Sequence, residues 1–338
     1  MNRIVPTALA AAVLASPLLA VPAQAQTVYI AGTRAVGTTS SHVSQDEAYG
    51  ITHVWKTVVV PYPRTGWPLV GEFTVEQSVA IGTAEAHKVV KGGDTLYCVS
   101  QGCLVAEQFG QETDVSFVRV SFGDPGNSDG GFTQKLPKIP TIPKTTPSAP
   151  QENHVYSIEY DFAADAPDYP NPVSWANAVM GGIYDHPKYS QGYIWGKAQE
   201  DKVVQVDNED GKSNTTHYLI KQDDLPLTRP VRDTLYTLAP PKADKKVQRF
   251  MKAVDKVLKP IVDSGYKNAA KRKPTTSNVV KNPPWVTKTG DKPDVTTGNK
   301  VEPKKTETKT TKGGDHDDQE GDGAGAGASG VSGDPSDD

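Results

Sequence analysis

The sequence contains only two cysteines, Cys98 and Cys103, among its 338 residues. So few cysteines exclude a disulfide scaffold, and this pair fits either one disulfide or two buried thiols. A large excess of charge of one sign is also lacking, because the net charge is only -4. Without a basic excess, no nucleic-acid partner is expected.

A long hydrophobic run is missing from the N-terminus as well. Residues 1–25 begin with the positive charge of Arg3, continue through an apolar stretch at 4–20, and end in small residues at Ala25. The stretch is short and interrupted by two prolines, which disfavours a membrane span. The pattern predicts a secretory signal peptide cleaved near Ala25, and hence a secreted or cell-envelope protein, with a retained anchor as the alternative.

The last fifth of the chain lacks almost every large apolar residue. Residues 271–338 contain no Leu, Ile, Phe, Tyr, Met or Cys; they are Lys/Thr/Pro-rich at first and acidic and Gly/Asp-rich from Asp315 onward. Such a segment buries too little apolar surface to offset the entropy of ordering it, so we expect a disordered tail. Residues 26–270 then remain as one large α/β domain.

Within that domain, short apolar runs alternate with segments of helical periodicity. This alternation predicts βαβ units and a mostly parallel sheet, with the active site at the carboxyl ends of the strands. Strands are predicted at 27–31, 55–61, 95–99, 115–122, 154–160 and 217–220, and helices at 75–91, from 101 to about 110, at 173–180 and at 244–265.

The most informative stretch is 95–104, where an apolar strand runs into Ser100 and Gly102 and then into a helix. This layout is typical of a nucleophile elbow, in which a sharp turn exposes a serine hydroxyl above the sheet. The usual pattern is Gly-x-Ser-x-Gly, and Cys98 stands here in place of the first glycine. We therefore predict a serine hydrolase or acyltransferase.

A serine nucleophile needs a histidine base and a carboxylate, which follow it in the chain order of α/β hydrolases. His186, in a polar loop, is favoured as the base over His217, which begins a short strand. Asp165 is favoured as the carboxylate over Asp161, because Asp165 lies in the turn after the predicted strand.

The oxyanion needs backbone N–H donors. We expect one from Gln101, directly after the serine, and a second from the first strand's loop at Thr33 or Gly32. The Pro- and Gly-rich loop 123–152 is a candidate lid over an acyl-chain groove. No cofactor or metal is expected.

The predicted helix at 244–265 is basic and amphipathic. We expect it to be kinked or broken near Pro260, since proline removes a helical hydrogen bond. Packing of its apolar face on the domain is favoured, and binding to a membrane surface is the alternative.

The chain also resembles the PE-PPE domain, a cutinase-like serine α/β hydrolase of mycobacteria and their relatives. The resemblance covers nearly all of 27–267. Its main pieces are Ala31-Gly32-Thr33, Val60-Pro61-Tyr62-Pro63, Tyr97-Cys98-Val99-Ser100-Gln101-Gly102, Gly123-Asp124-Pro125, Tyr160-Asp161-x-x-x-Asp165-x-Pro167, His186-Pro187-x-Tyr189 and Asp224-Leu225-Pro226-Leu227. The charged tail and Cys98 depart from the family pattern, and a signal peptide stands in place of a PE or PPE leader.

The resemblance implies a three-layer α/β-hydrolase fold and a Ser-Asp-His triad. It also implies esterase, lipase or acyltransferase activity on acyl lipids, since some relatives transfer acyl chains between trehalose glycolipids of the outer envelope. We expect an acyl-lipid or glycolipid substrate, with contact to the envelope or a membrane surface as a further partner. The alternative is a catalytically inactive envelope-binding protein that retains the fold.

Overall fold

A seven-stranded sheet forms the centre of the fold. The computed structural model describes residues 25–143, 151–206, 214–267, 269–270 and 272–288. The strand order is β2-β1-β3-β4-β5-β7-β6, and every neighbouring pair is parallel except β6 and β7. The strands are β1 (Thr27–Ile30), β2 (Val58–Val59), β3 (Thr95–Val99), β4 (Val118–Phe122), β5 (Glu152–Ile158), β6 (Val203–Val206) and β7 (Thr215–Ile220).

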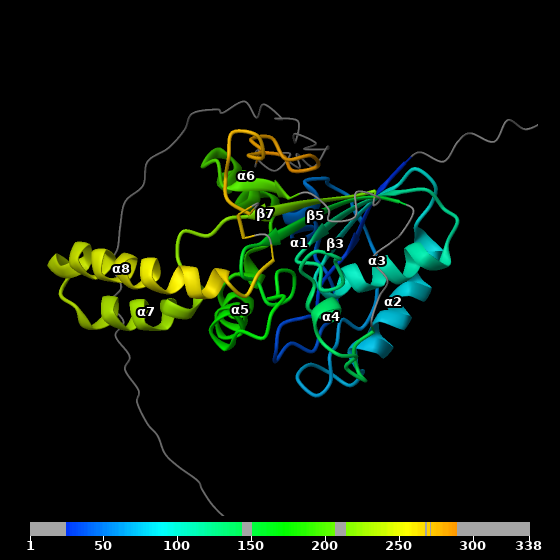
Figure 1. Cartoon of the computed structure of the whole chain (residues 1–338). Helices are drawn as coiled ribbons and strands as arrows, with labels where there is room; N and C mark the ends of the chain where they lie inside the picture. The colour runs from blue at the N-terminus through cyan, green and yellow to red at the C-terminus, as the bar shows by residue number, and fades with distance from the viewer. Residues whose placement is uncertain (1–24, 144–150, 207–213, 268, 271, 289–338) are drawn as a thin grey trace, which may run out of the picture. The chain divides into compact units, whose positions relative to one another are not determined.

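Helices cover both faces of this sheet, which gives three layers (Figure 1). One core cluster packs α2 and α3 on the sheet through residues such as Val79 and Leu104, and another packs α1 and α6 through Ile51 and Ile194. The helices are α1 (Gln45–Thr52), α2 (Val75–Val89), α3 (Gln101–Glu112), α4 (Phe132–Lys135), α5 (Pro172–Tyr184), α6 (Gln191–Gln199), α7 (Arg229–Leu238) and α8 (Asp244–Asp263), with 3-10 turns η1 (His186–Lys188), η2 (Pro226–Thr228) and η3 (Pro241–Ala243).

The predicted α/β class is confirmed, and the details differ at several elements. Helices α1, α6 and α7 were not predicted, and the strand expected at 55–61 is confined to Val58–Val59. Helix α8 continues through Pro260 to Asp263, so the expected break does not occur. Pro260 lies in the last turn on the exposed side of the helix, where water can satisfy the carbonyl that loses its partner. Strand β6 was not predicted, because four residues on the edge of a sheet give a weak pattern.

The expected domain boundary at residue 270 is wrong for the described part of the tail. Residues 272–288 lie against the domain, where Val280 N–H donates to the carbonyl of Val203 at 2.8 Å and Val286 is buried. The composition of the whole tail is polar on average, so it does not reveal the few apolar residues, such as Val280 and Val286, that make this contact possible. The rest of the predicted tail, 289–338, and the predicted signal peptide, apart from Ala25, lie outside the described residues.

Candidate active site

The turn between β3 and α3 holds Ser100 in a strained backbone conformation. Its φ of 51° and ψ of -122° lie in a region that residues with a side chain rarely adopt. The Ser100 N–H donates to the carbonyl of Phe122 at 2.9 Å, which ties the turn to the neighbouring strand. Gly102 is required next to it, because a Cβ there would overlap the carbonyl oxygen of Ile30. This local geometry is that of a nucleophile elbow.

The two cysteines form a disulfide across this turn. Cys98 lies on β3 and Cys103 on α3, both fully buried, and their Cα atoms are 4.9 Å apart. The sequence fits either a disulfide or two buried thiols, and the structure has the disulfide. The bond therefore links the strand and the helix that hold Ser100.

Ser100 is the first member of a chain of three hydrogen-bonded side chains. Its Oγ lies 2.8 Å from Nε2 of His186. Nδ1 of His186 lies 2.8 Å from Oδ2 of Asp161. When the Nδ1–H of His186 donates its hydrogen bond to the carboxylate, Nε2 carries no proton and can accept the proton of the serine. The structure thus brings together the predicted serine and the favoured histidine.

The preference for Asp165 over Asp161 as the partner of His186 is wrong. Asp165 instead accepts two hydrogen bonds from the Arg272 guanidinium, at 2.8 and 2.6 Å, and one from the N–H of Tyr160 at 2.7 Å. Burial raises the pKa of Asp165, and the Arg272 charge opposes that rise only in part. Asp165 is therefore a partner of the C-terminal segment.

Asp161 is fully buried and held by several donors. Besides His186, the hydroxyl of Tyr189 donates to its Oδ2 at 2.8 Å, and the N–H of Ala163 donates to its Oδ1 at 3.0 Å. These bonds replace the water that the carboxylate loses on burial. They also fix the orientation of the carboxylate toward the imidazole.

Tyr189 is a residue of the site to which sequence analysis gave no role. Its hydroxyl donates to Asp161 and accepts the N–H of Ile158 at 2.8 Å. Its ring lies edge-on to the His186 ring, with centroids 5.5 Å apart. A Cβ at Gly123 would collide with the Tyr189 ring, so a glycine is needed there. Only the spacing His186-Pro187-x-Tyr189 hinted at this role.

The imidazole of His186 is tuned by two opposing effects. Burial lowers the pKa of His186, while the charge of Asp161 and its hydrogen bond raise it. The two contributions of Asp161 prevail, so the pKa of His186 lies above its usual 6.5. A base with a raised pKa accepts the serine proton more readily.

The alternative histidine, His217, lies elsewhere. It is a buried residue of β7, and its Nε2 lies 3.3 Å from Oγ of Ser128. The structure therefore does not bring His217 to Ser100.

The candidate oxyanion donors lie on either side of Ser100. The backbone N–H of Gln101 belongs to the first turn of α3, where N–H groups have no acceptor within the helix. Its side chain turns away and donates to the carbonyl of Thr65 at 2.7 Å. Gly32 lies against Ser100, since a Cβ there would approach the Ser100 Cβ to 3.1 Å. Thr33 and Ser100 both line one cavity, which is described next.

A cavity of about 530 Å³ opens beside Ser100 and His186. Apolar side chains such as Tyr29, Ile51 and Val99 line it together with charged groups. The predicted acyl-groove lid is not supported, because no described residue of 123–152 lines this cavity. The loop packs elsewhere, with the Phe132 and Phe162 rings stacked at 5.1 Å.

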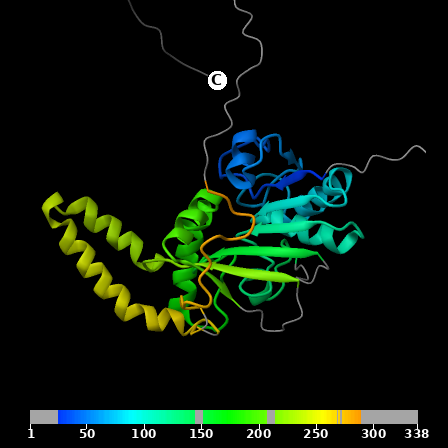
Figure 2. The same cartoon turned by 90° about the horizontal axis from the view of Figure 1, so that it is seen from above.

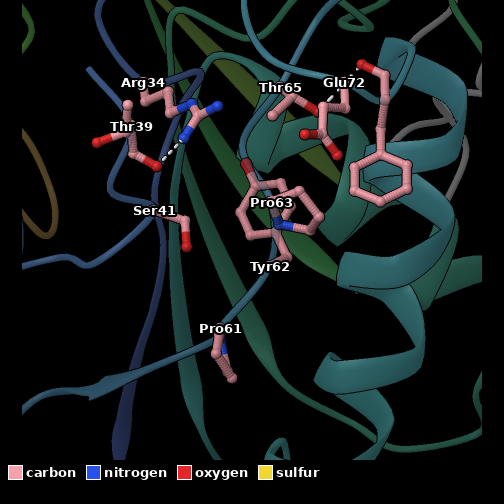
Figure 3. Close-up of a pocket in the computed structure, with 9 residues that line it drawn as sticks. Arg34, Thr39, Ser41, Pro61, Tyr62, Pro63, Thr65 and Glu72 are labelled. Carbon is pink, nitrogen blue, oxygen red and sulfur yellow. Dashed lines mark hydrogen bonds between the residues drawn. The ribbon is translucent and has the colours of Figure 1, made fainter.

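A second, more polar cavity of about 410 Å³ is lined by residues that include Arg34, Thr39 and Thr65 (Figure 3). Arg34 reaches into this region and donates to the carbonyl of Thr39. The Arg34 N–H also donates to the carbonyl of Arg64 at 3.0 Å, and Arg64 lines the cavity beside Ser100. The loop after β1 therefore borders both cavities.

The part of the chain that the structure describes lacks both a membrane-spanning helix and a cluster of metal ligands. None of its helices is both long and apolar enough to cross a membrane. Within the same residues, no cluster of three or more His, Cys, Asp or Glu side chains is arranged to hold a metal ion.

A sequence model of the PE-PPE domain matches residues 55–267, which is more than half of the chain. The mostly parallel sheet with helices on both faces is an α/β fold, as the sequence predicted. The chain belongs to the PE-PPE domain family.

Curated relatives come from Mycobacterium tuberculosis (strain ATCC 25618 / H37Rv). The esterase PE16 is 31% identical over 195 residues, which cover 50% of this chain and 35% of that protein. The SL1278 acyltransferase Chp1 is 31% identical over 229 residues, 62% of this chain and 53% of that protein. An uncharacterised PPE family protein, PPE28, is 36% identical over 126 residues, 35% of this chain and 18% of that protein. The chain thus spans about half or less of these relatives.

Proposed function

We propose that this protein is a serine carboxylic ester hydrolase or acyltransferase acting on acyl lipids. The observation that carries the proposal is the hydrogen-bonded chain from Ser100 through His186 to Asp161 beside a cavity. A serine hydroxyl becomes a useful nucleophile only with such a base and orienting carboxylate. The names of the relatives PE16, an esterase, and Chp1, an acyltransferase, support the same class of reaction.

In the first half-reaction, Ser100 Oγ attacks the ester carbonyl carbon as its proton passes to Nε2 of His186. The carbonyl oxygen becomes an oxyanion, which the backbone N–H of Gln101 and a second donor at Thr33 stabilise. The charge of Asp161 stabilises the imidazolium that forms. That imidazolium then protonates the departing alcohol, and the acyl group stays esterified to Ser100.

In the second half-reaction, a hydroxyl group attacks the acyl-enzyme. His186 takes the proton of that hydroxyl and returns it to Ser100 Oγ as the acyl group leaves. With water as the acceptor the product is a free acid, and with a lipid or sugar hydroxyl it is a new ester. The apolar part of the cavity suits the acyl chain in either case.

The proposed setting is the cell envelope, reached by secretion and cleavage near Ala25, with envelope glycolipids as substrates. The N-terminal charge and apolar pattern supports the secretion step.

Hydrolysis of p-nitrophenyl esters of increasing acyl length tests the proposal. We expect turnover by the parent chain and a loss of roughly 10³-fold or more in Ser100→Ala, because the nucleophile is gone. Ser128→Ala is the matched control, since it removes a hydroxyl beside the other histidine and should leave activity intact. A fluorophosphonate should label Ser100 in the parent and not in Ser100→Ala. A folded parent without turnover or label would refute the proposal in favour of an inactive envelope-binding protein.

A further inference from the structure

Only part of the apolar side of α8 is covered by the domain. Met251 and Val262 are buried, with 1% and 0% of their surface exposed. Phe250, Val257 and Ile261 are instead 58%, 71% and 45% exposed. The predicted packing of α8 on the domain therefore accounts for one part of its apolar side and leaves another part open.

The exposed apolar residues form a continuous stripe. Phe250, Val257 and Ile261 are spaced seven and four residues apart, which places them on one line along a helix. Helix α7 carries a similar pair, Val231 and Leu238, which are 54% and 78% exposed. Three exposed residues at this spacing form a patch rather than scattered single contacts.

The two helices form one hairpin beside α5 (Figure 2). An ion pair of 2.7 Å between Arg232 of α7 and Asp255 of α8 fastens them to each other. Thr228, at the start of α7, donates to the same Asp255 at 2.6 Å. The exposed apolar residues therefore lie on a helical hairpin whose two helices are joined by side-chain contacts, and not on an isolated helix.

Basic side chains follow the stripe on the side away from the buried residues. At 100° per residue, Lys246 lies next to Phe250, and Arg249 and Lys256 lie beyond it. None of these three forms an ion pair with any residue that the structure describes. Two of the aspartates of α8 are already engaged, Asp255 with Arg232 and Asp263 with Lys259. The flank of α8 beside the stripe is therefore positively charged at Lys246 and Arg249, while Lys256, on its far side, also borders a cavity that Asp223, Asp224 and Asp255 line.

We propose that this α8 surface, formed by Phe250, Val257 and Ile261 with Lys246, Arg249 and Lys256, docks on an anionic lipid surface. Apolar side chains of an amphipathic helix enter the boundary between headgroups and acyl chains, while lysine and arginine extend to the phosphates. A second copy of this chain fits less well, because the basic flanks of two copies would repel each other.

The docking surface is connected to the sheet edge that carries the site. Tyr160 directly precedes Asp161, and its hydroxyl donates to Asp263 of α8 at 2.6 Å. Lys259 of α8 also donates to this hydroxyl. Docking would hold the edge of the sheet that carries Ser100 and its cavity close to the lipid. The docking proposal does not depend on ester chemistry.

Vesicle co-sedimentation of the full chain tests the inference. The vesicles are phosphatidylcholine alone or phosphatidylcholine mixed with phosphatidylglycerol, and binding should favour the anionic mixture. We expect Phe250→Ser/Val257→Ser/Ile261→Ser and, separately, Lys246→Gln/Arg249→Gln/Lys256→Gln to weaken partitioning by about tenfold or more. Leu69→Ser, at a residue 80% exposed elsewhere, is the matched control and should bind like the parent.

A direct probe of insertion protects the test from variants that fail to fold. Phe250→Cys labelled with an environment-sensitive dye should brighten and shift to the blue on anionic vesicles, whereas labelled Leu69→Cys should not. Unchanged binding in both triple variants would overturn the inference. A parent chain that is a dimer in solution, and that becomes a monomer only in Phe250→Ser/Val257→Ser/Ile261→Ser, would also overturn it. Ser100→Ala should bind vesicles like the parent, which separates a failure of docking from a failure of the ester chemistry.

Discussion

Two aspartates of one loop, Asp161 and Asp165, are both buried and yet serve different parts of the molecule. Asp161 contacts His186 and Tyr189, which lie at the cavity. Asp165 contacts Arg272, 107 residues further along the chain. The carboxylate beside a titratable imidazole can orient it and stabilise its charged form, whereas the carboxylate beside a guanidinium meets a permanent charge. A buried carboxylate is therefore assigned to function or to structure by its partner.

The largest expected effect is on Asp161. Asp161→Asn keeps the shape but removes the charge that stabilises the imidazolium, and it disturbs the tautomer of His186. We expect kcat/KM for ester hydrolysis to fall roughly 10³- to 10⁴-fold. Thermal unfolding should show that the variant is folded. A fall of less than tenfold would contradict the distinction between the two aspartates.

Asp165 should show the opposite pattern. Asp165→Ala leaves the Arg272 guanidinium buried without its partner, and we expect a loss of about 3–5 kcal/mol in the free energy of unfolding. Activity per folded molecule should stay within a few-fold of the parent. Urea unfolding measures the loss, and the double variant Asp165→Leu/Arg272→Met should recover part of it. Without any recovery, the loss could not be attributed to the stranded charge.

Tyr189→Phe sharpens the comparison on the Asp161 side. The variant removes one donor from Asp161 and leaves the Ile158 N–H without an acceptor. We expect a loss of about 1–3 kcal/mol in stability and a smaller effect on kcat than in Asp161→Asn. Tyr184→Phe is the matched control, because it removes a tyrosine hydroxyl that contacts Asp233 at the surface. Equal effects in the two variants would remove Tyr189 from the site.

The smallest expected effect is a displacement of the pH profile. In the proposed mechanism His186 acts as a base only when it is neutral, so kcat/KM should fall as the pH drops through the pKa of His186, which lies above 6.5. Asp161→Asn should move this limb to lower pH, because the raising charge is gone. Arg272→Met should leave the limb where it is in the molecules that remain folded. A limb that moves in Arg272→Met would show that the two carboxylates are coupled.

The elbow was predictable almost to the residue because its signals are local. The apolar run of 95–99, the serine and the small residue after it are adjacent in sequence, and β3 and α3 follow these bounds closely. The α/β class was predictable for the same reason. Alternating strand and helix patterns indicate a parallel sheet without any knowledge of contacts.

The choice between the aspartates was not predictable from local sequence. Both Asp161 and Asp165 follow the same strand, and the difference between them is decided by Arg272, in a segment whose composition indicates disorder. The partial exposure of α8 was hidden in a similar way. Helical periodicity defines an apolar side, but only the neighbouring elements decide how much of that side is covered.

The contact between Arg272 and Asp165 also has a genetic consequence. The match to the family ends at residue 267, so a nonsense codon directly after it would leave the serine, the histidine and both aspartates of the loop intact. Such an allele would nevertheless encode a protein with a stranded buried carboxylate and an uncovered sheet edge. Its phenotype would resemble a folding defect rather than an active-site lesion, although every residue of the proposed chemistry is still encoded.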